Sequence, residues 1–252
     1  MIEELVTHHC EKCEGMDIHR NGRESDGRQK YICRGCGYHG RLREIGPRAP
    51  GGVEAKAAAE ERKEEVISAS LERCSLRGLE RIFQVPRQRI AAWIGEKAAT
   101  LPPLSETVSR GGRGSSVQLD EVWTFVGSKD NPVYLWTALN TNTREIIAWH
   151  LGDRSATSAK AMWEQIPPSY QQAWFYSDLL ASYPTAFPWH HLIQSGKETG
   201  LTAYMERWNY TLRQRLGRFV RKTLSFSKSI HHLKQHLSVF IHHYNKTLTA
   251  SF

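Results

Sequence analysis

Two aspartates stand in segments that are otherwise strongly apolar. Asp120 interrupts the Val-, Leu-, Trp- and Phe-rich run of residues 117–127, and Asp178 directly follows the apolar residues 173–177. A carboxylate in such a place is costly unless it has a strong partner. If both segments are neighbouring strands, the carboxylates meet at one sheet edge, where a divalent cation would remove their mutual repulsion. The pattern favours a metal site; the alternative is that Asp120 pairs with a basic side chain and Asp178 caps a turn.

A third carboxylate, from Glu206, would complete a site for two metal ions. Glu206 is the only acidic residue after Glu198. Helical spacing places it on one face with Asn209, Tyr210 and Arg213. Other acidic residues compete for the same role, namely Glu121, Asp153, Glu164 and Glu198.

Four of the five cysteines form two Cys-x-x-Cys pairs, with nineteen residues between the pairs. This spacing is typical of tetrahedral zinc sites, in which each pair forms a tight knuckle that aims two thiolates at one metal. The alternatives are two disulfides or unrelated thiols, and His8 and His9 compete as ligands. We predict a zinc ribbon over residues 1–45, with one structural Zn²⁺ ion held by Cys10, Cys13, Cys33 and Cys36.

The residues between the pairs support a hairpin that brings the second knuckle back to the first. Asn21-Gly22 is a turn signal, and residues 29–32 alternate like a strand. Gly35 and Gly37 suit the second knuckle, where a positive φ is often needed. Cys74 lies far from both pairs and is predicted to be a free thiol on a helix.

Composition and charge narrow the class of protein. The 252 residues are 40% hydrophobic and 10% aromatic, which fits a globular protein and excludes collagen-like, mucin-like and mainly disordered chains. Apolar runs are too short to span a membrane. Residues 1–5 lack the features of a secretory signal, so we expect a cytoplasmic protein. Of the net charge of +8, residues 200–252 contribute nine basic against one acidic residue. Such a surface most often binds phosphates; a solvated basic helix is the alternative.

Residues 53–100 have a helical pattern that predicts a DNA-binding module. Ser75 is placed to cap a short helix carrying Leu76, Leu79 and Ile82, and Pro86 begins a second helix after a turn. Two helices joined in this way resemble a helix-turn-helix, whose second helix enters the major groove. A helical spacer is the alternative. The side chains expected to reach DNA are Arg87, Gln88 and Arg89, near Ala92 on the outer face.

Beyond a Pro- and Gly-rich linker at 101–116, the pattern changes to strands that alternate with helices. The strands are predicted at 117–127, 133–139, 145–151, 172–177 and 190–193. The helices are predicted at 158–165, 182–187 and 202–222, with a last helix capped by Ser227. This order is that of an RNase H-like α/β domain over 117–252, in which the first and fourth strands are neighbours.

The sequence resembles a known family, the transposases of insertion sequence family one. The resemblance runs through nearly the whole chain, including both N-terminal modules. It is carried by Leu119-Asp120-Glu121-Val122-Trp123, Tyr176-Ser177-Asp178, Met205-Glu206-Arg207-Trp208-Asn209 and, most specifically, the run from Arg221 to Ser229. It implies a DDE transposase/integrase catalytic domain in which Asp120, Asp178 and Glu206 are the three acidic residues.

The resemblance also implies a reaction, cofactors and partners. Two Mg²⁺ (or Mn²⁺) ions at the three carboxylates would support cleavage at the ends of the element and joining of the freed 3′-hydroxyls to target DNA. The partners would be terminal inverted repeats and target DNA, with a homo-oligomer bringing two ends together in a prokaryotic nucleoid. Backbone contacts are expected from Arg207, Asn209, Arg213, Arg218, Arg221 and Lys222.

Two other classes of protein fit part of the pattern. One is a DNA-binding regulator with an inactive nuclease fold, against which the three intact carboxylates argue. The other is an RNase H-like nuclease or resolvase that cuts without joining. Such an enzyme would need neither two recognition modules nor the Ser225–Ser229 run. Only the transposase reading predicts joined DNA products.

Overall fold

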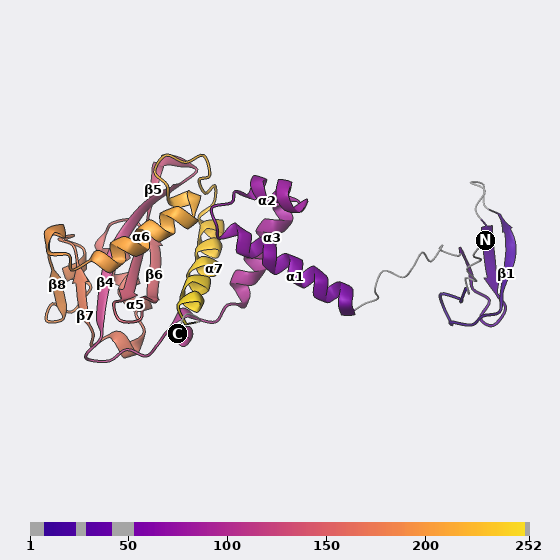
Figure 1. The fold of residues 1–252 in the computed structure, drawn as a ribbon, viewed down its shortest axis with the longest axis horizontal. Coiled ribbons are helices and arrows are strands. Elements are labelled where there is room, and N and C mark those ends of the chain that lie inside the picture. Colours follow the sequence, from indigo (N-terminus) through magenta and orange to yellow (C-terminus); the bar gives the residue numbers. More distant parts are fainter. Residues whose placement is uncertain (1–7, 24–28, 42–52, 250–252) are drawn as a thin grey trace, which may run out of the picture. The chain divides into compact units, whose positions relative to one another are not determined.

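The computed structural model describes residues 8–23, 29–41 and 53–249, and Figure 1 shows their elements. The chain divides into two compact units, Met1–Glu60 and Glu61–Phe252. The boundary falls inside helix α1 (Val53–Ser70). No helix in these described ranges is long and apolar enough to cross a membrane.

The first unit contains a small antiparallel sheet of β1 (Ile18–Arg23), β2 (Gln29–Cys33) and β3 (His39–Arg41), in that order. The strand expected at 29–32 is therefore confirmed. Asn21-Gly22 lies within β1 instead of forming the hairpin turn. Gly22 has φ +72°, and the β1–β2 register shifts between Arg20 and Arg23, so this pair forms an irregularity in the strand. The connection from β1 to β2 lies outside the described residues.

The second unit is built on a mixed five-stranded sheet with the order β6-β5-β4-β7-β8. Its first three strands are antiparallel, whereas β4 pairs with β7, and β7 with β8, in parallel. The expected neighbourhood of the first and fourth strands is thus confirmed. The strands are β4 (Ser116–Val126), β5 (Ser128–Asn140), β6 (Ile146–Gly152), β7 (Trp174–Ser177) and β8 (Leu192–Gln194).

Helices cover both faces of this sheet (Figure 1). On one face, α6 (Ala203–Arg215) and α7 (Ile230–Thr249) pack on Val122 of β4. On the other face, α5 (Ala156–Gln165) packs on Val117 and Leu119. Alternation along β4 therefore sends its even-numbered side chains toward α6 and its odd-numbered ones toward α5. Short 3-10 turns complete the unit at Pro168–Tyr170, Tyr183–Thr185, Lys197–Thr199 and Gly217–Phe219.

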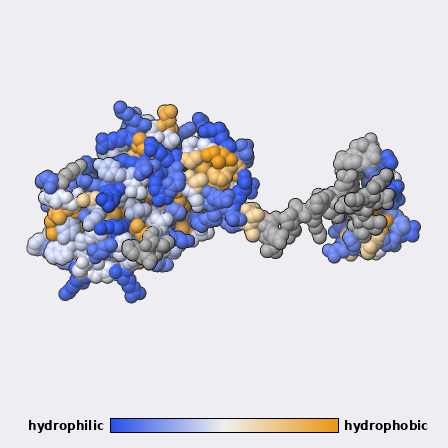
Figure 2. Space-filling view, viewed as in Figure 1, coloured by the Kyte–Doolittle hydropathy of each residue, from blue (hydrophilic) through white to orange (hydrophobic). Residues whose placement is uncertain are grey.

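The helical pair expected after Ser75 is present as α2 (Leu76–Phe83) and α3 (Arg87–Thr100). The Ser75 hydroxyl accepts a hydrogen bond from the Gly78 amide at 3.0 Å, which confirms the cap. Leu79 of α2 is fully buried, but Ile82 is 67% exposed, contrary to the expected apolar face. Figure 2 shows an apolar patch over this helix on an otherwise mostly hydrophilic surface. Because α3 packs on α7, both helices belong to the same compact unit as the sheet.

Residues 101–116, which the sequence indicates as a linker, are held to the sheet of the second unit. They contain the short helix α4 (Leu104–Thr107). The Tyr170 hydroxyl donates to the carbonyl of Ser109 at 2.8 Å, and the Ser109 amide donates to Glu145 at 3.2 Å. These bonds fix the path by which the chain enters β4.

Two expectations near the C-terminus are wrong. The helix predicted at 202–222 ends at Arg215, because Leu216 turns to an extended conformation that buries its side chain and leads into a tight turn. Ser227 does not cap the last helix, which begins at Ile230. The Ser227 carbonyl instead accepts a hydrogen bond from the Gly127 amide at 2.8 Å and forms a bridge beside Val126.

The buried His236 of α7 makes the stability of this unit sensitive to acid. Its Nε2 donates to the carbonyl of Ser70 at 3.1 Å, and burial, helped by the nearby charge of Arg218, lowers its pKa to about 3. The unfolded chain would take up a proton below about pH 6.5, but the folded chain would not until near pH 3. Stability is therefore full above pH 6.5 and is lost as the pH falls below it.

We expect the free-energy advantage of the natural chain over His236→Gln to shrink by about 2 kcal/mol between pH 8 and pH 5. Urea unfolding at several pH values measures this difference. His231→Gln, at an exposed position of the same helix, is the matched control and should show no such change. A pH-independent gap between His236→Gln and the natural chain would contradict the assignment of a neutral, buried imidazole.

Candidate active site

Strand pairing brings Asp120 and Asp178 together. In the parallel pair of β4 and β7, Val117 lies opposite Phe175 and Gln118 opposite Tyr176. Continuing this register two residues further sets Asp178 beside Asp120, just where β7 ends. Carboxylate oxygens of Asp120, Glu121 and Asp178 lie within 4.8 Å of one another. The two aspartates that the sequence selects are therefore neighbours, as expected.

Hydrogen bonds fix the orientation of both aspartates. Asn209 of α6 donates from Nδ2 to Oδ2 of Asp120 at 2.6 Å, and the Glu121 amide donates to Oδ1 at 2.8 Å. Asp178 accepts at Oδ1 from the amide of Leu180 at 3.1 Å. Asp178 thus caps a turn, which is the role that the alternative to a metal site gives it. It also belongs to the cluster of three carboxylates.

Helix α6 is anchored on β4 directly beneath these carboxylates. The buried Gln118 accepts a hydrogen bond at Oε1 from the Met205 amide at 2.8 Å, in the first turn of the helix. Glu206 follows at a half-buried position, and Asn209 lies one turn further along the same face. Glu206 therefore lies between Met205 and Asn209, the two residues that bind α6 to β4. It is not among the three carboxylates that lie within 4.8 Å of one another.

Of the four competing acids, only Glu121 joins the group. Asp153 accepts hydrogen bonds from the Ser155 and Ser158 hydroxyls at the start of α5, which lowers its pKa to about 2. It holds the beginning of a helix. Glu164 and Glu198 lie at exposed positions.

Glu121 is the competing acid that the structure brings into the carboxylate group. Its side chain is only 1% exposed and forms a 3.0 Å ion pair with Arg154. Burial raises its pKa to about 7, with smaller contributions from Asp178 and Asp120, while the hydroxyl of Tyr183 and the charge of Arg154 oppose the rise. Because side chains alternate along a strand, Glu121 approaches the site from the α5 face and Asp120 from the α6 face.

The three carboxylates fit a hard divalent cation. Carboxylate oxygens are the donors that Mg²⁺ and Mn²⁺ prefer. Three of them within 4.8 Å repel one another, and Arg154 forms an ion pair with Glu121. A cation between them would relieve that repulsion.

The four predicted cysteine ligands also meet in the first unit. The Sγ atoms of Cys10 and Cys36 are 3.5 Å apart, and those of Cys13 and Cys33 are 3.6 Å apart. Sulfurs bound tetrahedrally to one Zn²⁺ at 2.3 Å would be about 3.8 Å apart, so the thiols fit a single zinc ion. His8 and His9 are not in this group.

The two knuckles share one backbone geometry. The fifth residue of each, Glu14 or Gly37, has a positive φ and donates its amide to the carbonyl of the first cysteine, at 2.9 and 2.8 Å. Gly37 thus needs positive φ as expected. Burial opposes ionisation of Cys10, but amides of the knuckle and the neighbouring thiols outweigh it and lower its pKa to about 6. A thiolate is the form that binds zinc.

The predicted DNA-contacting residues fall into three groups. Arg87, Gln88 and Arg89 are exposed at the start of α3, as a recognition helix requires. Asn209 is buried and Arg218 is partly buried, donating to the Ser227 hydroxyl at 3.1 Å. Those that are exposed or half-buried near the end of α6 and beyond are Arg207, Arg213, Arg221 and Lys222.

Comparison with known proteins agrees with this arrangement. A family model described as IS1 transposase matches residues 115–247, which include the whole sheet, α6 and most of α7. InsB of insertion element iso-IS1n from Shigella dysenteriae is 36% identical over 125 residues, covering 49% of this chain and 92% of that protein. The InsB protein of IS1 2 from Escherichia coli K12 is 31% identical over 132 residues, covering 51% and 72%.

Together the mixed sheet, its carboxylates and these matches define the class of the protein as a transposase of bacterial insertion sequences. More particularly, the chain belongs to the IS1 transposase family. The resemblance carried by the sequence motifs is thus confirmed. Residues before 115 lie outside the matched region.

Proposed function

We propose that this chain is a DDE transposase with an RNase H-like catalytic domain, which cuts DNA at the ends of an insertion sequence and joins those ends to target DNA. The observation that carries the proposal is the meeting of Asp120 and Asp178 at the β4–β7 edge, inside the region that matches the IS1 family. The strand order, antiparallel for three strands and then parallel, supports the same fold.

Asp120, Asp178 and Glu206 are the residues that would hold two Mg²⁺ or Mn²⁺ ions. When bound, such ions lower the pKa of an attacking oxygen and stabilise the leaving oxygen. Glu206 is supported by its place on α6, between the Met205 amide that bonds Gln118 and the Asn209 amide that bonds Asp120.

Neighbouring residues of the chain orient these carboxylates and set the charge around them. Asn209 holds Asp120 in one orientation, so that its Oδ1 and the Asp178 carboxylate lie at the same edge. Arg154 neutralises Glu121 and leaves the two aspartates as the charged pair. Preorientation of this kind matters because a carboxylate that must first reorganise binds and reacts less well.

Basic residues beyond the carboxylates would hold the DNA. Arg207, Arg213, Arg221 and Lys222, which lie on or after α6, would contact phosphates without reading sequence. The exposed start of α3 would read bases in the terminal repeats. Because two ends must be brought together, we propose that the protein acts as a homo-oligomer on the chromosomal DNA of a prokaryotic cell.

The four-cysteine site is proposed to hold one structural Zn²⁺ and to make the small sheet a DNA-binding ribbon. So short a segment has too little apolar surface to fold without a metal. We expect Cys33→Ser to lose about one equivalent of zinc and to weaken binding to terminal DNA. Metal analysis of the purified protein measures the first effect.

Cys74→Ser is the matched control, because Cys74 lies outside the four-thiol group. It should keep the zinc. The fold of residues 61–249 should persist in both variants, as judged by limited proteolysis. An unchanged zinc content in Cys33→Ser would contradict the zinc site.

A plasmid that carries the ends of the corresponding insertion sequence tests the proposed function. The chain is incubated with it in Mg²⁺, and the cut positions are mapped at nucleotide resolution. We expect breaks with free 3′-hydroxyls at the element ends, absent when Mg²⁺ is replaced by EDTA. Metal-independent breaks, or none at the element ends, would contradict the proposal.

A further inference from the structure

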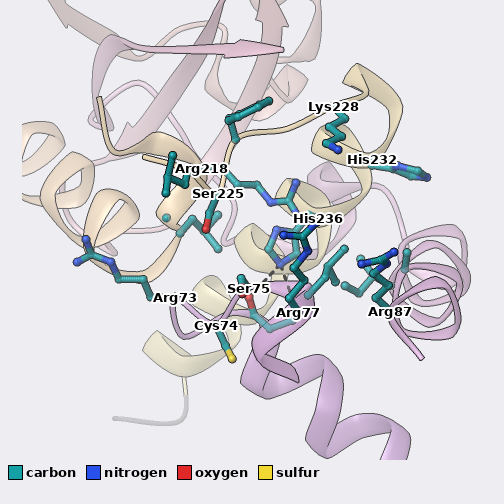
Figure 3. Close-up of a pocket in the computed structure, with 18 of the residues that line it drawn as sticks. Arg73, Cys74, Ser75, Arg77, Arg87, Arg218, Ser225, Lys228, His232 and His236 are labelled. Atoms are coloured by element: carbon teal, nitrogen blue, oxygen red, sulfur yellow. Dashed lines mark hydrogen bonds between the residues drawn. The ribbon is translucent and has the colours of Figure 1, made fainter. Parts of the chain in front are cut away.

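A large basic cavity lies in the second unit, apart from the carboxylate site. It measures about 730 Å³ and is lined by residues at the start of α2 and α3, the turn after α6, residues 224–228 and one side of α7. Figure 3 shows His236 near its centre, with basic side chains around it. Leu76, Leu216 and Phe226 give it a partly apolar lining.

The charge of this cavity is strongly one-sided. No Asp or Glu is among its lining residues. Arg215 is paired with Glu72 at 2.5 Å. Among the described residues no carboxylate forms an ion pair with the other lining cations, which are Arg73, Arg77, Arg81, Arg87, Arg218 and Lys228. So many unpaired cations around one hollow repel one another and favour an anionic occupant.

Two partly or fully buried groups point to a ligand in the same place. His236 is only 5% exposed, and its Nδ1 is buried without a hydrogen-bond partner in the described part of the chain. Arg218 has the Ser227 hydroxyl as its hydrogen-bond partner, and its burial lowers its pKa. A phosphate would supply the counter-charge that Arg218 lacks.

The position of the cavity relates it to the carboxylate site. Arg215, at the cavity, ends the helix that carries Glu206 and Asn209. Nine residues of helix separate Glu206 from Arg215, which is about 14 Å. Along one strand of duplex DNA this distance corresponds to about four nucleotides at 3.4 Å each.

We propose that this cavity binds the sugar–phosphate backbone of the same DNA whose reacting phosphodiester lies at the carboxylates, about four nucleotides away. The inference rests on the proposed function for the position of the DNA, and on the charge of the cavity for the binding itself. The arginines contact the phosphates, and Leu76 and Phe226 pack against the sugars. This backbone site adjoins the exposed start of α3 that would read bases, and Arg87 belongs to both.

The salt dependence of DNA binding tests the cavity. The full, zinc-loaded chain is titrated onto a fluorescein-labelled 40-base-pair duplex of arbitrary sequence, without Mg²⁺, at several salt concentrations. We expect Arg77→Ala with Arg81→Ala to flatten the slope of log affinity against log salt by about 1.8 units, at about 0.9 per lost contact. Both side chains are exposed, and the pair of Arg→Lys changes at these positions should keep the slope.

Lys129→Ala with Lys160→Ala removes the same charge from exposed positions outside the cavity. This control should leave the slope unchanged. Equal flattening in both double variants, or flattening in neither, would overturn the proposal.

Alkylation of Cys74 locates the DNA directly. Cys74 lines the cavity and is the one cysteine of five outside the four-thiol group. With DNA at ten times its Kd, we expect iodoacetamide to modify Cys74 about tenfold more slowly, because about one site in eleven is free. The Arg77→Ala, Arg81→Ala variant should lose this protection at the same DNA concentration.

An unprotected Cys74 in the natural chain at saturating DNA would overturn the proposal. Both experiments measure DNA binding in the absence of Mg²⁺, whereas the proposed function is tested by DNA cleavage and joining. A failure at the cavity therefore leaves the carboxylate chemistry standing, and a chain that binds here without cutting would contradict only the proposed function.

Discussion

Replacing Asp120 with Asn is expected to abolish both cleavage and joining while leaving DNA binding intact. The change keeps the volume and the Oδ1 acceptor but removes the charge that a divalent cation needs. Metal activation contributes several kcal/mol to such reactions, so we expect a loss of at least about 10³-fold. Single-turnover assays on DNA carrying the element ends measure the rates, and a gel-shift assay measures binding.

Asp130→Asn is the matched control for this change. Asp130 is exposed at the start of β5, where it accepts a hydrogen bond from Ser128 at 2.8 Å. The control should cut and join at the natural rate. A chain with Asp120→Asn that still joins pre-cut ends would show that Asp120 is outside the reacting centre.

The second large effect concerns the third carboxylate. We expect Glu206→Gln to lose cleavage by about the same factor as Asp120→Asn, because both would hold metal ions. Glu121→Gln should keep most of the activity, since Glu121 is already paired with Arg154 and approaches from the opposite face of β4. Parallel rate measurements in Mg²⁺ on both variants compare the two carboxylates.

The opposite pattern would reassign the site. If Glu121→Gln were inactive and Glu206→Gln active, the third ligand would be the acid that the structure already groups with the aspartates. Isothermal titration calorimetry measures the affinity of each variant for Mn²⁺. Loss of a metal ligand weakens Mn²⁺ binding even where activity is too low to measure.

Much of the carboxylate site was predictable from the sequence. Alternation of apolar residues defines β4 and β7, and a parallel β4–β7 pair is enough to bring Asp120 and Asp178 together. Metal-ligand spacing likewise predicts the four-thiol group, because a knuckle of fixed geometry follows from Cys-x-x-Cys alone. Both inferences depend on local pattern, which sequence records well.

The parts that were missed depend on tertiary contacts. Apolar spacing continues through Leu216 and Phe219, so it cannot show that the helix ends at Arg215 and that a 3-10 turn buries both side chains. The burial of Glu121 depends on Arg154 and Tyr183, more than thirty residues away. The basic cavity joins five separate segments, none of which is unusual by itself.

Joining of pre-cut DNA is the most direct measurement of the central claim that one carboxylate centre makes this chain a transposase. Duplexes ending in free 3′-hydroxyls at the element terminus are incubated with the chain, Mg²⁺ and a supercoiled target plasmid. We predict covalently joined products that require Mg²⁺ and are lost in Asp120→Asn, Asp178→Asn and Glu206→Gln. Cleaved but unjoined DNA, or bound DNA that is neither cut nor joined, would contradict it.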